Sequence, residues 1–302
     1  MHDDDCIRLL REVLPRLGMR WPGFRKPRGQ VCKRIARRMA ELGEGSVDGY
    51  LGRLEEHPDE WEVLDFLCRV TISRFRRDRR TWERLEGEVL PSLAERLEGE
   101  DGGRLRCWSA GCASGEEPYT LSLLWELGGL ARRFPGVEPF VLATDLDPHM
   151  VFRARRGVYP PGALKELPGE WVGEAFEPVN AGGSRGGGSG QGEAETGEPA
   201  ELRLRGRFRR PVRLVCADLR DPLPRARFHL VLCRNLPFTY YRKDLQERLL
   251  GALSRRVVPG GWLAVGAHEE LPRAWQERHG WRGRGEGLYR RARTGRMEGS
   301  EP

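Results

Sequence analysis

Two acidic side chains follow two consecutive apolar runs near the middle of the chain. Residues 104–119 predict a buried strand, a turn of small residues and the start of a helix, whose first turn contains Glu117. The next apolar run, residues 140–145, ends in Asp145. Open α/β sheets bind nucleoside ligands at the carboxyl ends of their strands, and carboxylates accept hydrogen bonds from hydroxyl and ammonium groups. This pattern predicts a nucleoside cofactor site.

The turn itself narrows the kind of ligand. Gly111 and Gly115, with the small residues between them, allow a ligand to come close to the backbone. No lysine follows as it does in a phosphate-binding loop, and the spaced Gly-x-Gly-x-x-Gly of dinucleotide folds is absent. A small-residue turn after a strand can also serve packing alone. The acidic end of the next strand favours ligand binding.

Asp145 is well placed to hold both ribose hydroxyls of a nucleoside, because it ends the second strand. Its alternative role is to cap the next helix, although Asp147, which precedes Pro148, suits that role better. Cys112 lies in the ligand turn, but no histidine is near it in sequence, so we do not expect a catalytic thiol. The seven cysteines show no Cys-x-x-Cys spacing, which predicts no metal site and small buried apolar roles for most of them.

Composition bounds the class of protein. The 302 residues can form one large or two ordinary domains, with 38% hydrophobic and 32% charged residues. No run reaches the roughly 18 apolar residues of a membrane span, and the first residues lack the layout of a secretory signal. We therefore expect a cytoplasmic, monomeric protein without membrane insertion. The net charge of +7 indicates an acidic partner: nucleic acid, lipid headgroups or acidic protein.

The chain changes character along its length. Residues 6 to about 98 have helical periodicity, as in Val31, Ile35 and Met39, and strands then alternate with helices. Such alternation is typical of a mainly parallel sheet covered on both faces. The strand candidates are residues 105–110, 140–145, 212–217, 228–233, 261–266 and 287–291.

We therefore predict an α/β fold in which an all-α domain precedes a doubly wound, mainly parallel sheet. The predicted division is a helical domain at 1–80, a linking helix at 81–103, the sheet domain at 104–293 and a disordered tail at 294–302. Residues 181–199 consist almost wholly of Gly, Ser, Glu, Gln, Ala and Thr. Such a segment cannot bury apolar surface, so a disordered loop is predicted there.

A dense basic cluster lies in the helical part. A helix from about 30 to 41 brings four side chains onto adjacent faces: Lys33, Arg34, Arg37 and Arg38. They suit the docking of an acidic helical protein substrate, and solvated surface charge is an equally good interpretation. A nucleic-acid groove is a weaker alternative, because few aromatic residues are interleaved with these charges.

Four motifs follow the helical part in a fixed order. They are Ser-Ala-Gly-Cys-Ala-Ser-Gly-Glu-Glu-Pro-Tyr at 109–119, Ala-Thr-Asp-Leu-Asp at 143–147, Leu-Cys-Arg-Asn at 232–235 and Pro-Gly-Gly-Trp-Leu at 259–263. With them the chain resembles the CheR family of chemotaxis receptor methyltransferases from about residue 6 to 292. The resemblance implies a class I, Rossmann-like sheet and S-adenosylmethionine as methyl donor. It further implies a chemoreceptor glutamate as acceptor and a methyl ester as product.

The resemblance also assigns roles to individual residues. Arg77, in the loop 71–78, and Tyr240 match the family's active-site arginine and tyrosine. The cofactor-binding residues that it implies are Thr71, Ser73, Arg77, Gly111, Glu117, Asp145, Asp218, Leu219, Arg234 and Asn235.

The chain departs from the family pattern at several positions. Arg76 replaces an aromatic residue, Asp218 replaces asparagine, and the spacing from Asn235 to Tyr240 is one residue longer, so Thr239 or Tyr241 could take the tyrosine's place. In Gly266-Ala-His-Glu269, we interpret His268 as structural. The segment 181–199 falls where the family has a small β-subdomain, which we expect to be shortened, with part of it surviving at 202–210.

The implied chemistry requires no general base, because a glutamate with a pKa of about 4.3 is already an anion at neutral pH. Arg77 would position a carboxylate; its alternative is one more solvated charge in an arginine-rich run. Two other functions remain open. One is a methyltransferase of the same fold for another side chain or a small molecule, and the other is a non-catalytic module that binds the cofactor or nucleic acid.

Overall fold

The computed structural model describes residues 2–98, 103–179 and 201–293. The predicted disordered segments at 181–199 and 294–302 lie outside the described residues.

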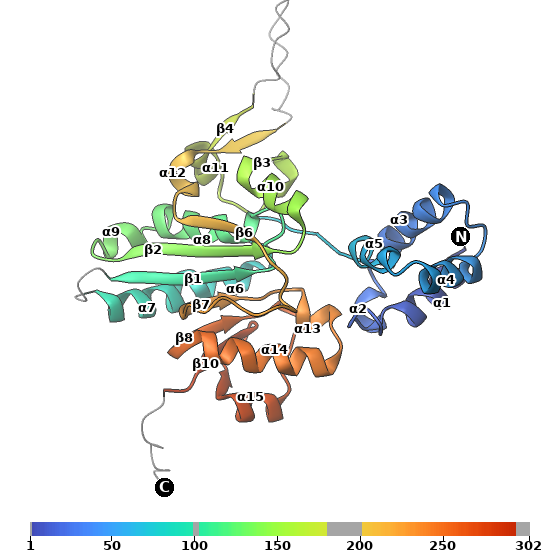
Figure 1. Ribbon diagram of the computed structural model, residues 1–302. Coiled ribbons are helices and arrows are strands. Elements are labelled where there is room, and N and C mark those ends of the chain that lie inside the picture. The colour runs from blue at the N-terminus through green and yellow to red at the C-terminus, as the bar shows by residue number, and fades with distance from the viewer. Residues whose placement is uncertain (1, 99–102, 180–200, 294–302) are drawn as a thin grey trace, which may run out of the picture.

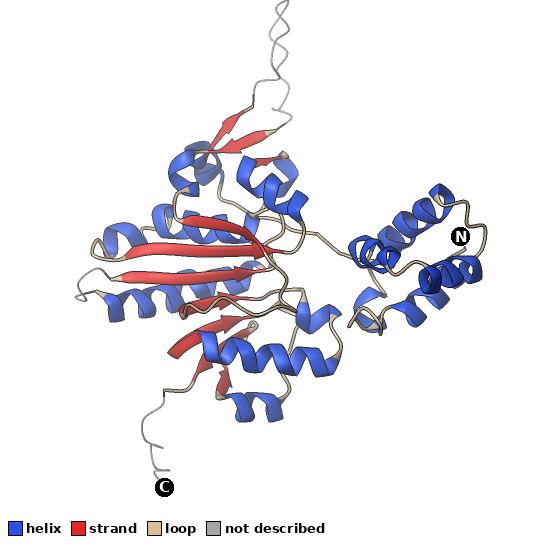
Figure 2. Cartoon of the chain, viewed as in Figure 1, coloured by secondary structure: helices blue, strands red, loops and turns tan. Residues whose placement is uncertain are grey.

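The N-terminal part consists of helices (Figures 1 and 2). They are α1 (Asp3–Val13), α2 (Trp21–Phe24), α3 (Arg28–Glu41), α4 (Val47–Glu56) and α5 (Asp59–Leu67). We call residues 3–67 the helical domain. Val31, Ile35 and Met39 lie one turn apart on α3 and are all buried in its core, which confirms the predicted periodicity.

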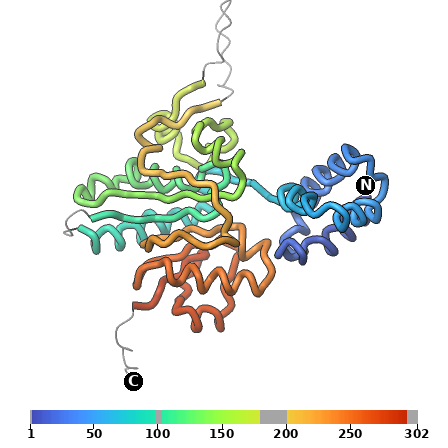
Figure 3. The backbone as a smooth tube through the Cα atoms, viewed as in Figure 1, coloured from blue at the N-terminus to red at the C-terminus, as the bar shows by residue number. Residues whose placement is uncertain are grey.

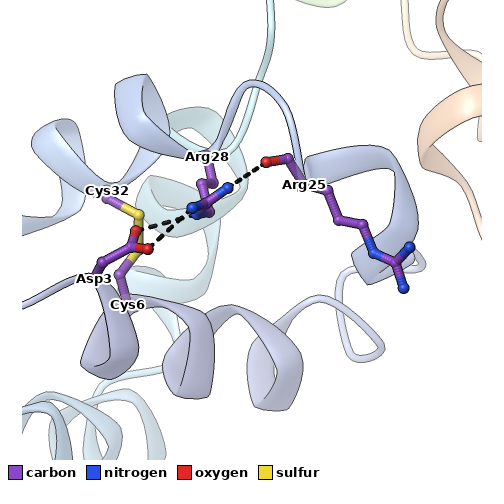
Figure 4. Close-up of a disulfide and its surroundings, with 5 residues drawn as sticks. All are labelled: Asp3, Cys6, Arg25, Arg28 and Cys32. Carbon is purple, nitrogen blue, oxygen red and sulfur yellow. Dashed lines mark hydrogen bonds and ion pairs between the residues drawn. A yellow bond between two sulfur atoms is a disulfide. The ribbon is translucent and has the colours of Figure 1, made fainter.

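A disulfide between Cys6 and Cys32 joins α1 to α3 (Figure 4). Beside it, Arg28 donates two hydrogen bonds to the Asp3 carboxylate, at 3.1 and 3.0 Å. Small buried apolar roles were predicted for most of the cysteines, and this pairing was not predicted. Nothing in a separation of 26 residues indicates which turns of two helices meet.

A single non-helical segment connects the helical domain to the rest of the chain (Figure 3). Between Leu67, where α5 ends, and Arg79, where α6 begins, no helix forms, so the expectation of helix throughout 6–98 is wrong there. Arg76 and Asp78 have positive φ angles of 51° and 65°. This conformation is costly for residues with a Cβ and ends regular structure.

A long helical stretch then enters the sheet domain. It comprises α6 (Arg79–Arg84), the π-helical η1 (Leu85–Val89) and α7 (Leu90–Leu97). Trp82, Leu85 and Leu93 lie in the same core as Cys107 of the central strand. These helices therefore pack as part of the sheet domain.

The main sheet has seven strands in the order β6-β2-β1-β7-β8-β10-β9. The strands are β1 (Arg104–Ala110), β2 (Glu138–Asp145), β6 (Val212–Cys216), β7 (Phe228–Leu232), β8 (Val257–Ala264), β9 (Trp281–Gly283) and β10 (Leu288–Arg291). The first five of the spatial order are parallel and β10 is antiparallel to both its neighbours, which confirms the predicted mainly parallel sheet. The chain proceeds outward from β1 on one side and returns to β7 on the other, so a topological switch point lies between β1 and β7.

Helices cover both faces of this sheet (Figure 1). They include α8 (Glu116–Leu127), α9 (Leu130–Arg133), α10 (Pro148–Arg156), α13 (Pro237–Tyr240), α14 (Lys243–Arg256) and α15 (Arg273–His279). Successive residues of β1 point to opposite layers: Cys107 packs in a cluster with Leu123 of α8, and Trp108 in another with Leu253 of α14.

A second, antiparallel sheet of three strands lies beyond α10, in the order β3-β5-β4. Its elements are β3 (Val158–Tyr159), η2 (Pro161–Ala163), α11 (Gly169–Ala175), β4 (Phe176–Pro178), β5 (Leu202–Leu204) and α12 (Gly206–Arg209). Phe75 packs edge-on against Tyr159 and Phe176, at 4.9 and 5.5 Å between ring centroids, and so joins this sheet to the main core. The subdomain thus retains three strands, more than the part at 202–210 that was predicted.

Candidate functional site

One pocket opens at the carboxyl ends of β1, β2 and β7, on the side that faces the helical domain. Every residue predicted for the cofactor or for catalysis lines it: Thr71, Ser73, Arg77, Gly111, Glu117, Asp145, Asp218, Leu219, Arg234, Asn235 and Tyr240. Met19 and Phe24 of the helical domain also line it, which was not predicted. The roles of these residues remain predictions; their common location is what the fold supplies.

The turn after β1 is fixed to the end of β2. The backbone amides of Gly111 and Cys112 both donate to the carbonyl of Thr144, at 2.8 and 2.9 Å. Gly111 has φ 85°, and a Cβ on it would lie 2.5 Å from Leu236. Here glycine is required by the left-handed backbone and by close packing. Burial raises the pKa of the Cys112 thiol well above its usual value, which disfavours the thiolate that a nucleophile needs.

Asp145 and Asp147 have separate tasks. Asp147 caps α10, because its Oδ1 accepts from the amide of His149 at 2.8 Å. Asp145 instead accepts from the amide of Ala113 at 2.8 Å and from that of Asp147 at 2.9 Å. These two bonds hold the carboxylate at the pocket wall, while burial raises its pKa.

Glu117 occupies the opposite side of the same turn. Its carboxylate accepts from the Ser109 hydroxyl at 2.7 Å and from Arg234 Nη1 at 3.3 Å. Burial raises its pKa, and the nearby Arg234 guanidinium opposes that shift. Two oriented carboxylates in one pocket suit the hydroxyl and ammonium groups of a nucleoside that carries an amino acid.

Arg234 connects three parts of the site. Only 3% of its side chain is exposed. Through Nη2 it donates to Asp78 at 2.9 Å and to the carbonyl of Arg77 at 2.7 Å, and it lies over the Trp82 ring at 5.2 Å. The resemblance implies a cofactor contact here. In the structure the guanidinium holds the 71–78 loop and Glu117 in place.

The two neighbouring arginines of that loop differ in environment. Arg77 is half-buried, lines the pocket and donates to the carbonyl of Ile72 at 2.7 Å. Arg76, which replaces an aromatic residue of the family, is buried, pairs with Glu86 at 3.1 Å and lies over the Trp171 ring at 5.3 Å. The ion pair and the aromatic contact explain how a charge occupies this core position.

The structure separates one of the three candidates for the active-site hydroxyl from the other two. Tyr240 and Tyr241 line the pocket, whereas the Thr239 hydroxyl donates to Glu269 at 2.6 Å. Burial raises the pKa of Tyr240, so its hydroxyl stays protonated at neutral pH. Sequence reasoning missed Glu269, which also accepts from the amide of Asn235 at 2.8 Å. The motif Gly266-Ala-His-Glu269 contains this glutamate beside His268, and the histidine is exposed.

Asp218, the replacement for asparagine, has a specific partner. Arg220 donates to it through Nε at 2.8 Å and also binds Asp65 of α5, at 2.8 and 3.0 Å. All three side chains line the pocket. This interdomain contact was not predicted.

The predicted docking cluster on α3 is divided. Arg38 pairs with Glu60 at 2.7 Å and Arg34 donates to the carbonyl of Arg69 at 2.6 Å, so both are engaged within the protein. Lys33 and Arg37 are exposed, one turn apart. Of the four residues predicted to dock a partner, these two therefore have exposed side chains.

Comparisons with known proteins show what this chain is similar to. A family model described as "CheR methyltransferase, SAM binding domain" matches residues 71–188. The chemotaxis protein methyltransferase of Klebsiella aerogenes is 30% identical over 81% of this chain and 76% of its own length. Chemotaxis protein methyltransferase 1 of Pseudomonas aeruginosa is also 30% identical, over 80% of this chain and 81% of its own.

Solved structures give more distant similarity. An S-adenosylmethionine-dependent methyltransferase from Mesorhizobium loti is 19% identical, with a TM-score of 0.26, over 58% of this chain and 51% of its own.

The fold and the pocket define a methyltransferase with a Rossmann-like sheet whose cofactor is S-adenosylmethionine. More specifically, the chain belongs to the CheR family of chemotaxis protein methyltransferases. No helix among residues 2–98, 103–179 and 201–293 is long and apolar enough to cross a membrane.

Proposed function

We propose that this protein transfers the methyl group of S-adenosylmethionine to glutamate side chains of a chemoreceptor cytoplasmic domain, forming methyl esters in the cytoplasm. One observation carries the proposal. Arg77 and Tyr240 lie in the same pocket as Glu117 and Asp145, and neither histidine nor lysine is among the described residues that line it. The carboxylates of the pocket accept hydrogen bonds from backbone amides, from Ser109 or from arginines. A pocket with a carboxylate-binding group and no histidine or lysine suits an acceptor that is already ionised.

The proposed reaction requires no general base. The cofactor supplies a methyl group on a positively charged sulfur. A glutamate with a pKa of about 4.3 enters as the anion, an O–C bond forms as the S–C bond breaks, and the two charges neutralise each other. Because charge disappears, strong binding of the ground-state carboxylate would slow the step. Arg77 is therefore proposed to orient the acceptor more than to stabilise it, and Tyr240 to donate a hydrogen bond that aligns the reacting groups.

The remaining pocket residues are proposed to hold the cofactor. Asp145 would accept from the ribose hydroxyls, Glu117 would accept from a hydroxyl or ammonium group, and Asp218 and Leu219 would border the same ligand. Exposed Lys33 and Arg37 on α3 are proposed to attract an acidic helical acceptor.

The test uses cofactor with a labelled methyl group and a purified chemoreceptor cytoplasmic fragment. We expect label on the fragment that mild alkali releases, and loss of that label with Arg77→Ala. Arg79→Ala is the matched control, because Arg79 is exposed and pairs with Glu83 of its own helix.

Other outcomes would contradict the proposal. An alkali-stable product would indicate a different acceptor group. No transfer, together with strongly salt-dependent binding of polyanions, would indicate a non-catalytic module. Unchanged methyl transfer by Arg77→Ala would show that Arg77 has no role in the reaction.

A further inference from the structure

The segment between α1 and α2 lies directly against the segment that carries Tyr240. The amide of Arg20 donates to the carbonyl of Tyr240 at 2.8 Å, and the amide of Arg242 donates to the carbonyl of Gly18 at 2.8 Å. Between them, Met19 and Tyr241 form an isolated antiparallel bridge. A short piece of the helical domain is thus hydrogen-bonded, as in a β-ladder, to the backbone of the proposed active-site tyrosine.

The Arg20 side chain adds two bonds to the same region. Its Nη2 donates to the carbonyl of Phe238 at 2.8 Å and its Nε to that of Thr239 at 3.1 Å. These carbonyls belong to α13, a helix of four residues. The last carbonyls of a helix lack partners within it, and an arginine can satisfy them. Arg20 therefore closes the end of the helix on which Tyr240 stands.

Helix α2 packs against α13 at van der Waals distance. A Cβ on Gly23 would lie 2.5 Å from the carbonyl oxygen of Thr239, so only glycine permits this approach. The next residue, Phe24, meets the Tyr240 ring edge-on, with ring centroids 5.2 Å apart. The backbone and the ring of Tyr240 are both contacted from the helical domain.

We propose that Arg20 is a positioning residue that fixes Tyr240 for methyl transfer, which makes the helical domain part of the catalytic pocket. The inference rests on the proposed role of Tyr240. Within its own domain α13 is held by Glu269 through Thr239 and by Gln246, which donates to the carbonyls of Phe238 and Tyr241. Those contacts maintain the helix, whereas Arg20 and Phe24 determine where the Tyr240 ring lies. Arg20 is not among the described residues that line the pocket, so it would act through Tyr240.

The first experiment compares Arg20→Met with Arg16→Met. Arg16 precedes it in the same loop, but its side chain pairs with Glu55 and stacks on Trp61 inside the helical domain. We expect kcat for the chemoreceptor fragment to fall about tenfold in Arg20→Met, because a small misplacement of a reacting group is costly. The Kd of S-adenosylhomocysteine by calorimetry should change by less than about twofold. Arg16→Met should match the wild type, and Arg20→Lys should recover part of kcat, since an ammonium can still donate to one carbonyl.

A double-mutant cycle separates positioning from general stability. In a Tyr240→Phe background, Arg20→Met should have little further effect on kcat, because the hydroxyl that it positions is gone. An unchanged kcat in Arg20→Met would overturn the inference. So would a tenfold loss that persists in full in the Tyr240→Phe background.

A structural measurement keeps this inference distinct from the proposed function. In the full-length protein with 3-fluorotyrosine at position 240, Arg20→Met should shift or broaden the fluorine resonance, and Arg16→Met should leave it unchanged. If the wild type does not methylate the fragment, the proposed acceptor is wrong, yet this measurement still reads Tyr240. An identical resonance in wild type and Arg20→Met would contradict the positioning role.

Discussion

Arg220 and Asp65 form a two-point ion pair that joins the sheet domain to the helical domain, with N–O distances of 2.8 and 3.0 Å. The same guanidinium binds Asp218, which stands where the family has asparagine. Asp218 therefore adds a carboxylate to the pocket, and the Arg220 guanidinium that pairs with it also binds Asp65 of α5. The departure from the family pattern and the interdomain contact are parts of one arrangement.

We predict that Arg220→Met and Asp65→Asn each weaken binding of S-adenosylhomocysteine, and that their effects are not additive. A coupling free energy on the order of 1 kcal/mol is expected for side chains in direct contact. Calorimetric titration of the wild type, both single variants and the double variant measures it. Arg273→Met is the control, because its exposed side chain pairs with Glu277 of its own helix. Additive effects would show that the pair does not connect the domains energetically.

Asp145 and Asp147, two positions apart in the sequence, are expected to differ in role: the first should bind the cofactor and the second should cap α10. Asp145→Asn keeps the shape but removes the charge that accepts from ligand hydroxyls, so cofactor affinity should fall by about tenfold or more. Asp147→Ala removes the cap of α10 and should lower the free energy of unfolding by about 1 kcal/mol, with little effect on affinity. Calorimetry and urea denaturation distinguish these outcomes. The reverse pattern would exchange the two assignments.

His229 should make stability depend on pH. Its Nδ1 accepts from the amide of Arg106 at 3.0 Å, and burial lowers its pKa to about 4. The unfolded chain, in which a histidine has a pKa of about 6.5, binds a proton more readily than the folded protein does. The stabilisation that comes from neutral His229 is therefore fully present above about pH 6.5. As the pH falls from about 6.5 toward 4, the free energy of unfolding should decrease by on the order of 2 kcal/mol.

Urea denaturation across that range measures the effect. His229→Asn should flatten the pH dependence, and His268→Asn, at an exposed position, should not. Parallel curves for wild type and His229→Asn would contradict the prediction.

The disulfide in the helical domain should contribute measurably to stability. In the chain-entropy view, closing a loop between Cys6 and Cys32 stabilises the fold by about 3 kcal/mol. Replacing both cysteines by serine, or adding dithiothreitol, should therefore lower Tm by similar amounts. Cys216→Ser, at an exposed free cysteine, is the control. Disulfides are uncommon in reducing cytoplasm, so an equal Tm with and without reductant would show that the thiols stay free.

The main sheet could be predicted from the sequence because its strands are continuous apolar runs. β8 began four residues earlier than predicted, at Val257, since Pro259 and the glycines after it are typical of a turn, and β1 and β2 began slightly earlier than predicted. The three-residue β9 (Trp281–Gly283) was not predicted. The strands of the second sheet have only two or three residues each, too few to produce a periodic signal.

Glu117 and Asp145 could be anticipated because they follow predicted strands, whereas Thr71, Ser73 and Arg77 were indicated only by the resemblance to the family. The contacts between the domains could not be anticipated, because Arg220 and Asp65 are 155 residues apart, and Arg20 lies more than 200 residues from α13. Charges that meet only after two domains pack leave no local pattern. Arg234 shows the converse: the motif identified its place, but only the contacts with Asp78 and Glu117 indicate its function.

The wall that Met19 and Phe24 supply has a practical consequence for how the enzyme is produced. The matched cofactor-binding region begins at residue 71, and a protein started there would keep Glu117 and Asp145, the two carboxylates proposed to hold the cofactor. It would also leave the ring of Tyr240 open to water on one side. Such a truncated enzyme would also lack Asp65, the partner of Arg220, so it should bind the spent cofactor more weakly as well as turn over poorly. The helical domain therefore belongs in any version of the enzyme that is made for assay.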